Sequence, residues 1–153
     1  IAEERDRRAL GVAVCQAFGS HIAQVAEVQA DGNGVPRVTD IWCVVDCGIA
    51  INPATVAAQI EGGTIFALTA ALQGAVNVEE GRIVEGNFDS YPLLRIHEIP
   101  RISVELLPSS EAPGGVGELA VPAVAPAVAN AWRQATGQRV RALPLRRPDI
   151  ARA

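Results

Sequence analysis

Residues 52–72, NPATVAAQIEGGTIFALTAAL, show which kind of fold this chain can adopt. Asn52 is a favourable N-cap, Pro53 fits the first turn of a helix, and apolar residues then recur at helical spacing. The pattern therefore predicts a central helix. The helical spacing of apolar residues is interrupted at Gly62 and Gly63. Two glycines inside a helix cost about 2 kcal/mol relative to alanine. Either another backbone or a ligand comes close to the helix at that point.

Two apolar, partly alternating stretches precede this helix, at residues 10–18 and 21–30. The Gly19-Ser20 pair separates them, which predicts a β-hairpin. The turn sequence DGNG at residues 31–34 then leads into a third apolar stretch, residues 37–47. The first third of the chain is therefore expected to be a small antiparallel meander.

The second half of the chain alternates between turns and regular structure. Residues 79–100 are typical of turns and short strands, and residues 101–110 alternate as a strand does. A helix is expected over residues 126–136, ending at Gly137. The prolines at the two ends of residues 122–126 predict that this short segment is extended or forms a single turn.

The expected fold class is α+β, with antiparallel or mixed strands, a central glycine-containing helix and a C-terminal helix. Residues 1–9 form a charged N-terminal segment, and residues 10–144 form one domain of ordinary size. Residues 145–153 form a basic tail, which we expect to lie on the surface or to face a partner.

The overall composition excludes several classes of protein. Of 153 residues, 49% are hydrophobic and 20% charged, so a core can be buried. The net charge of −4 and the 4% aromatic content give no basis for nucleic-acid binding. No uninterrupted run of 18 apolar residues occurs, so no transmembrane segment is expected. The chain starts at Ile1 and contains no methionine, which suggests a piece of a longer protein.

The three cysteines, Cys15, Cys43 and Cys47, are expected to be reduced thiols that act as small hydrophobic residues. An odd number argues against a disulfide framework. In a strand, Cys43 and Cys47 would share a face but lie roughly 13 Å apart, too far to chelate one ion. No second Cys or His pair completes a zinc site.

One acid, Glu118, follows the glycines at 114, 115 and 117 in PGGVGE, residues 113–118. Glycines allow a backbone to approach a ligand closely. Near a helix start the dipole lowers the pKa of a carboxylate and burial raises it, and an acid balanced between the two could act as a general base. The alternatives are a solvated glutamate in a flexible loop or a helix-stabilising acid.

Other polar residues admit a structural interpretation beside a functional one. Gln59 lies one turn before the two glycines of the central helix and could bond a polar ligand there, or it could lie on an exposed helix face. Asp46 and Asn52 are expected to cap turns. His21 and His97 have no acidic or nucleophilic neighbour at a suggestive spacing, so both are expected to be structural.

Four ordered blocks together resemble one protein family. They are VVDCGIAINPATVAAQIEGGTIFALTAAL at 44–72, GNFDSYPLLRIHEIPRISVELLPS at 86–109, PGGVGE at 113–118 and APAVANA at 125–131. They resemble the C-terminal part of the large molybdenum subunit of the xanthine dehydrogenase and aldehyde oxidase family. The bacterial branch typified by the isoquinoline 1-oxidoreductase beta subunit is the most similar, and FGSHIAQVAEV at 18–28 supports it. The resemblance runs from about residue 10 to about residue 144.

The resemblance implies a catalytic role for Glu118. The acid that closes the Gly-x-Gly-Glu motif of this family is the general base of a hydroxylation whose oxygen comes from water. Proline often follows that acid in the family, whereas Leu119 follows it here. The implied substrates are N-heterocycles or aldehydes. The family's subunit is several times longer, so this piece alone is expected to be inactive.

The resemblance also implies where the cofactor lies. It places Gln59, Gly62 and Gly63 along a molybdenum-pterin cofactor, expected as molybdopterin cytosine dinucleotide from bacterial relatives. It places three loop glycines beside the metal centre, namely Gly114, Gly115 and Gly117. No protein ligand to the metal is implied. The expected partners are the remainder of the molybdenum subunit and a separate subunit that carries iron–sulfur clusters.

Two hypotheses remain open at this point. The parent protein is a molybdenum hydroxylase, or the chain is a non-catalytic assembly or binding module of the same ancestry. The sequence leaves the location open between bacterial cytoplasm and periplasm, and it does not name the substrate or the electron acceptor.

Overall fold

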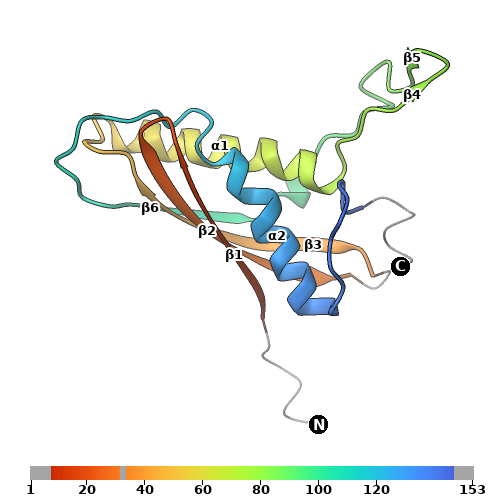
Figure 1. The fold of residues 1–153 in the computed structure, drawn as a ribbon, viewed down its shortest axis with the longest axis horizontal. Coiled ribbons are helices and arrows are strands. Elements are labelled where there is room, and N and C mark those ends of the chain that lie inside the picture. The colour runs from red at the N-terminus through yellow and green to blue at the C-terminus, as the bar shows by residue number, and fades with distance from the viewer. Residues whose placement is uncertain (1–7, 32–33, 147–153) are drawn as a thin grey trace, which may run out of the picture.

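The computed structural model describes residues 8–31 and 34–146, which form a four-stranded sheet with both long helices on one face (Figure 1). The sheet order is β1-β2-β3-β6, and β4 and β5 pair only with each other. The elements in chain order are β1 Ala9–Ala17, β2 Ser20–Ala30, β3 Pro36–Asp46, α1 Pro53–Leu72, β4 Val78–Glu79, β5 Arg82–Ile83, a 3-10 turn Ile96–Glu98, β6 Arg101–Leu106 and α2 Val121–Thr136.

The first three strands form the predicted antiparallel meander. β1 and β2 pair up to Ala17 and Ser20, so a two-residue turn joins them. Phe18 and Gly19 in that turn have φ values of 56° and 76°, the left-handed conformation that matches strand twist in tight hairpins. β2 pairs with β3 with an irregular register beside Glu27. Part of the predicted 31–34 turn lies outside the described residues.

The fourth strand makes the sheet mixed. β6 pairs parallel to β3, after a long connection that includes α1. A parallel pair needs such a crossover, whereas the hairpin-linked strands need only a turn. The α+β class with mixed strands and two helices is therefore confirmed.

Helix α1 begins where its sequence predicts. The Asn52 side chain accepts a hydrogen bond from the Thr55 amide at 3.1 Å, and Pro53 occupies the first turn. The helix then continues unbroken through Gly62 and Gly63 to Leu72. One side of α1 is buried in the core, at Val56, Ile60, Thr64, Ala67, Leu68, Ala71 and Leu72.

By length and composition, α1 is also apolar enough to cross a membrane, with a mean hydropathy of 1.3. That observation is weak evidence for a membrane span, because core helices of globular proteins have the same length and composition. In this fold, 44% of its most apolar window is buried, and α1 contacts β6 and α2.

Helix α2 is longer than the sequence predicts. It begins at Val121, not Pro126, so the expectation of an extended segment or single turn before Pro126 is wrong. Pro122 lies in the first turn, where a missing amide costs nothing, and Pro126 removes only one bond of the ladder. Burial of Ala123 and Val124 favours the helix despite that loss. The predicted end at Gly137 is confirmed, with φ of 78°.

Helix α2 lies unusually close to β1. A side chain at Gly11 would place its Cβ 2.0 Å from the Ala127 carbonyl oxygen, so only glycine fits there. Along the free edge of β1, Asn130 donates to the Val12 carbonyl at 3.0 Å, and the Leu10 amide donates to Gln134 at 2.7 Å. These two bonds fix α2 lengthwise on the sheet, and with it the loop that precedes α2.

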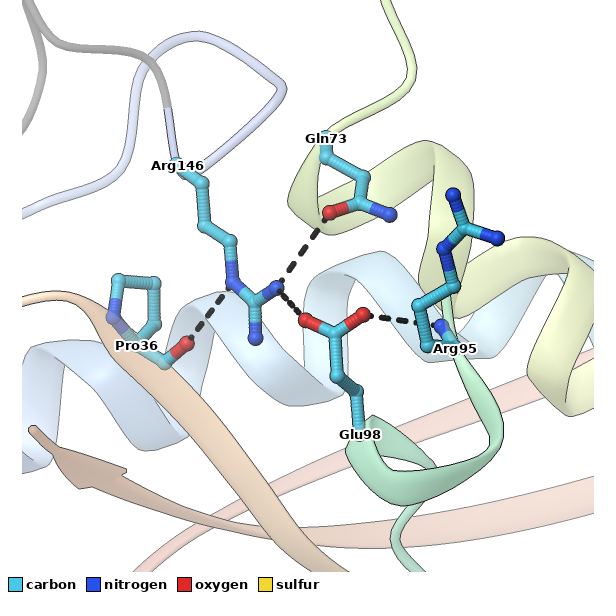
Figure 2. A network of polar contacts seen from close by, with 5 residues as sticks. All are labelled: Pro36, Gln73, Arg95, Glu98 and Arg146. Carbon is cyan, nitrogen blue, oxygen red and sulfur yellow. Dashed lines mark hydrogen bonds and ion pairs between the residues drawn. The ribbon is translucent and has the colours of Figure 1, made fainter. Parts of the chain in front are cut away.

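The segment after α2 returns to the end of α1 (Figure 2). Leu145 is 2% exposed, and its amide donates to the Ala71 carbonyl at 2.9 Å. The guanidinium of Arg146 donates to Glu98 at 2.8 Å, to Gln73 and to the Pro36 carbonyl. The expectation of a surface tail is therefore wrong for its first two residues, because they close the end of α1. Residues 147–153 and the charged residues 1–7 lie outside the described part.

Candidate functional site

The loop at residues 113–118 crosses three parts of the fold between β6 and α2. The Gly114 amide donates to the Cys47 carbonyl at 2.9 Å, just after β3. The Gly115 amide donates to the Phe18 carbonyl at 2.8 Å, in the turn between β1 and β2. The loop then reaches α1 and enters α2. Backbone bonds therefore hold the first half of the loop on the sheet and its turns.

The first two glycines of the loop are required by packing within this chain. A Cβ at Gly114 would lie 2.2 Å from Ser20 Oγ and 2.7 Å from the Gly19 carbonyl oxygen. A Cβ at Gly115 would lie 2.9 Å from Phe18 Cβ. The β1–β2 turn thus occupies the space on one side of both residues.

The third glycine of the loop lies against the middle of α1. The position of a Cβ on Gly63 is 3.7 Å from the Gly117 carbonyl oxygen and 3.4 Å from Ala120 Cβ. By contrast, a Cβ on Gly62 or Gly117 would meet nothing within 4 Å. The glycine pair of α1 therefore has one member that packs on the loop and one that faces open space.

Glu118 leaves the loop at this junction and is exposed. Its carbonyl accepts a bond from the Val121 amide at 3.1 Å, which makes it part of the turn that starts α2. Gln59 is also exposed, and it lies one helical turn before Gly62 and Gly63 on α1. The structure thus brings the glycine pair next to the end of the loop that carries Glu118.

A buried polar cluster that the sequence did not predict lies under this junction. Gln24 on β2 is fully buried and donates to Thr64 Oγ1 at 3.3 Å and to Cys43 Sγ at 3.5 Å. Burial raises the pKa of the Cys43 thiol, and the hydrogen bonds with Gln24 and Thr64 partly oppose that rise. The only sequence signal was a glutamine at an inward position of an alternating strand. The cluster joins the sheet to α1 at the residue after Gly63.

Other predicted roles are structural where the structure describes them. Asp46 accepts a bond from the Gly48 amide at 3.1 Å, and Asn52 caps α1, as expected for both. Cys43 and Cys47 are buried free thiols, and Cys15 is a half-buried one. Within residues 8–31 and 34–146, no group of three or more His, Cys, Asp or Glu side chains could hold a metal ion.

The groups at the junction fit an organic cofactor with polar edges. Gln59 offers an exposed amide, and the absence of side chains at Gly62 and Gly117 leaves a surface to which a flat group has access. In the described part of the chain, the backbone amides of Gly117 and Glu118 have no hydrogen-bond partner. Such groups can donate to ring and phosphate oxygens, but they do not bind a bare metal.

A family model for the molybdopterin cofactor-binding domain matches residues 9–100 of the chain. The matched region includes β1, β2, β3 and α1 with its glycine pair, and it ends before the loop that carries Glu118.

Individual relatives extend the similarity beyond that region. The beta subunit of isoquinoline 1-oxidoreductase from Brevundimonas diminuta is 40% identical over 144 residues, which cover 94% of this chain and 18% of the relative. A nicotinate dehydrogenase subunit from Pseudomonas putida is 38% identical over 80% of this chain and 10% of the relative. The crystal structure of quinoline 2-oxidoreductase from Pseudomonas putida 86 matches 82% of this chain and 17% of its own, with a TM-score of 0.77 and 27% identity. The chain thus spans less than a fifth of these relatives.

Proposed function

This chain belongs to the molybdopterin cofactor-binding domain family of xanthine dehydrogenase and aldehyde oxidoreductase large subunits, and we propose that it works as the C-terminal part of a molybdenum hydroxylase subunit. In this proposal, residues 10–144 form the C-terminal part of the cofactor-binding domain. The substrate is an N-heterocycle or an aldehyde, and the product oxygen comes from water. Electrons leave through iron–sulfur clusters on a partner subunit.

The observation that carries the proposal is the junction of α1 with the loop at residues 113–118. Gly63 packs on Gly117 there, and the exposed Glu118 follows directly. A Cβ at Gly62 or Gly117 would meet nothing within 4 Å, so neither position blocks the approach of a planar group. A carboxylate held at a fixed loop, next to open space, has the position that a general base needs.

Each residue of the junction then has a distinct task. When bound, a molybdenum-pterin cofactor, proposed as the cytosine dinucleotide, supplies the two-electron oxidation. Glu118 accepts, on a carboxylate oxygen, the proton of the water that provides the product oxygen. Gln59 donates and accepts hydrogen bonds along the cofactor edge. Gly62 and Gly117 leave space for it.

Three further glycines hold these groups in place from behind. Gly63 sets the contact between α1 and the loop, and Gly114 and Gly115 hold the loop on the β1–β2 turn. We propose that the cofactor also contacts Gly63, Gly114 and Gly115, each on the side opposite to its packing neighbour.

The test compares Glu118→Gln with wild type in the product of the complete reading frame, isolated with its partner subunit. Molybdenum and pterin contents are measured together with dye-coupled oxidation of N-heterocycles and aldehydes. The expected result is unchanged cofactor content with a loss of at least ~100-fold in rate, since general bases contribute about that much or more. Glu111→Gln, at another exposed acid of the same connection, is the matched control and should stay near wild type.

Two results would contradict the proposal. An active Glu118→Gln variant would place the base elsewhere. A wild-type protein without molybdenum would remove the enzymatic role altogether, and the non-catalytic assembly or binding module would then explain the family membership.

A further inference from the structure

Between α1 and β6, residues 76–90 leave the body of the fold as an arm whose tip is the β4–β5 hairpin (Figure 1). The base of the arm is held firmly. Asn77 bonds Glu85 through both its amide and its side chain, and the Val84 amide donates to the Asn77 carbonyl. Beyond the arm, the Tyr91 hydroxyl packs against Gly74 at the end of α1.

One face of the hairpin is apolar, and no residue of the described part of the chain covers it. Val78 pairs with Ile83 across the two strands, so their side chains point to the same side. Val76, in the segment that leads into β4, is exposed as well. The three side chains are 60–67% exposed. The opposite side carries the charged pair Glu79 and Arg82.

The arm also presents an aromatic ring from an ordered turn. The amides of Ser90 and Tyr91 donate to the Asn87 carbonyl, and the Phe88 amide donates to the Asn87 side chain. Phe88 is nevertheless 85% exposed. Val78 and Ile83 in the two strands and Phe88 in a hydrogen-bonded turn thus hold large apolar side chains in water. An isolated two-stranded hairpin is marginally stable, so an arm of this kind needs a surface to cover it.

We propose that the arm docks on another part of the same large subunit, outside these 153 residues. The inference rests on the proposed function and deepens it by naming the segment that joins this piece to the remainder. These two relatives are about five times as long as this chain, since the aligned part makes up only 18% of one and 17% of the other, so most of their mass lies outside the aligned part.

Charge defines the chemistry of the docking surface further. Residues 76–90 carry four acids, Glu79, Glu80, Glu85 and Asp89, against one base, Arg82. The surface that takes the arm is therefore an apolar groove with lysine or arginine side chains at its rim.

The test labels a cysteine at the apolar face of the arm in the product of the complete reading frame. Phe88→Cys and the control Gln138→Cys, at an exposed site after α2, are treated with a maleimide, and the modified peptides are quantified by mass spectrometry. Denatured samples give full labelling. The expected result is labelling of Phe88→Cys at least ~10-fold slower than of the control, with or without the partner subunit and at all protein concentrations.

Several outcomes would overturn the docking proposal. Fast labelling in every sample would show that nothing covers the arm. Protection only with the iron–sulfur subunit, or only at high concentration, would assign the surface to that subunit or to a second copy. If the complete reading frame adds no sequence to this chain, the proposed docking surface does not exist.

A second pair of variants guards against simple misfolding. Val78→Asp is expected to lower the thermal midpoint of the long chain and to expose Phe88→Cys, because it places a charge in the groove. Glu79→Gln, on the opposite side of the same strand, removes only one of the four acids and should change both far less. Labelling does not depend on molybdenum or turnover, so a failure of the proposed function would not alter this result.

Discussion

Gly114 and Gly117 lie three residues apart in one loop, yet the structure predicts opposite consequences for their replacement by alanine. At Gly114 the new Cβ would meet Ser20 Oγ at 2.2 Å and the Gly19 carbonyl oxygen at 2.7 Å. At Gly117 it would meet nothing within 4 Å. Comparing the two variants therefore distinguishes a glycine that packing within this chain requires from a glycine that only something outside this chain requires.

The magnitude for Gly114→Ala follows from two losses. Overpacking against a backbone carbonyl costs about 1–3 kcal/mol. Displacement of the loop also weakens the bond from the Gly114 amide to Cys47, which contributes about 1 kcal/mol. The free energy of unfolding should fall by about 2–4 kcal/mol, which lowers the melting temperature by roughly 5–15 °C for a chain of this size. Gly117→Ala should stay within about 0.5 kcal/mol of wild type.

The assay is urea and thermal unfolding of the three proteins, followed by far-UV circular dichroism. A Gly114→Ala protein as stable as wild type would refute the close approach of the loop to the β1–β2 turn. Equal destabilisation by Gly117→Ala would mean that the space beside that residue is filled by the chain itself.

Two further predictions concern titratable groups. The hydrogen bond from the Arg95 amide, and then the contact with Arg146, lower the pKa of Glu98, while burial opposes this effect. The stability contributed by ionised Glu98 is therefore present above the unfolded pKa of about 4.3 and is lost as pH falls through the lower folded pKa. Glu98→Gln should thus be less stable than wild type at pH 7 in urea unfolding, and the difference should shrink as pH falls below the unfolded pKa and through the lower folded pKa of Glu98; a difference independent of pH would contradict this. Burial raises the pKa of Cys43, so iodoacetamide at pH 8 should alkylate Cys15 at least ~10-fold faster, and equal rates in mapped peptides would disprove that burial.

Local signals made part of the fold predictable. The Asn52-Pro53 pair fixes the start of α1 because cap and first turn are decided by neighbouring residues. Gly19 likewise marks the β1–β2 hairpin, although the turn is Phe18-Gly19, one residue before the expected Gly19-Ser20 pair. Gly137 ends α2 for the same kind of reason.

The predictions from sequence fail where contacts between distant segments determine the structure. Pro126 predicted a helix start, but burial of Ala123 and Val124 against the sheet extends α2 by more than one turn. The parallel pairing of β6 with β3 has no signal in either strand alone. The basic composition around Arg146 concealed the fact that Leu145 is buried.

The candidate site divides in the same way. The motif around Glu118 was visible as a glycine-rich loop, and its proposed role came from the resemblance. The reason for Gly114 and Gly115 was not visible, because the turn that excludes their side chains lies almost a hundred residues earlier in the chain. Gln24 escaped notice because one polar residue in a strand gives no indication of its partner across the core.

The closure of α1 by the amides of Leu145 and Arg146 has a consequence for protein synthesis. These residues leave the ribosome long after α1, since Arg146 lies 73 positions beyond its partner Gln73. Until then, the last carbonyls of an apolar helix stay open to water, to chaperones and to proteases. A chain that ends between residues 137 and 144 would therefore carry an unfinished α1, a ready target for cellular quality control.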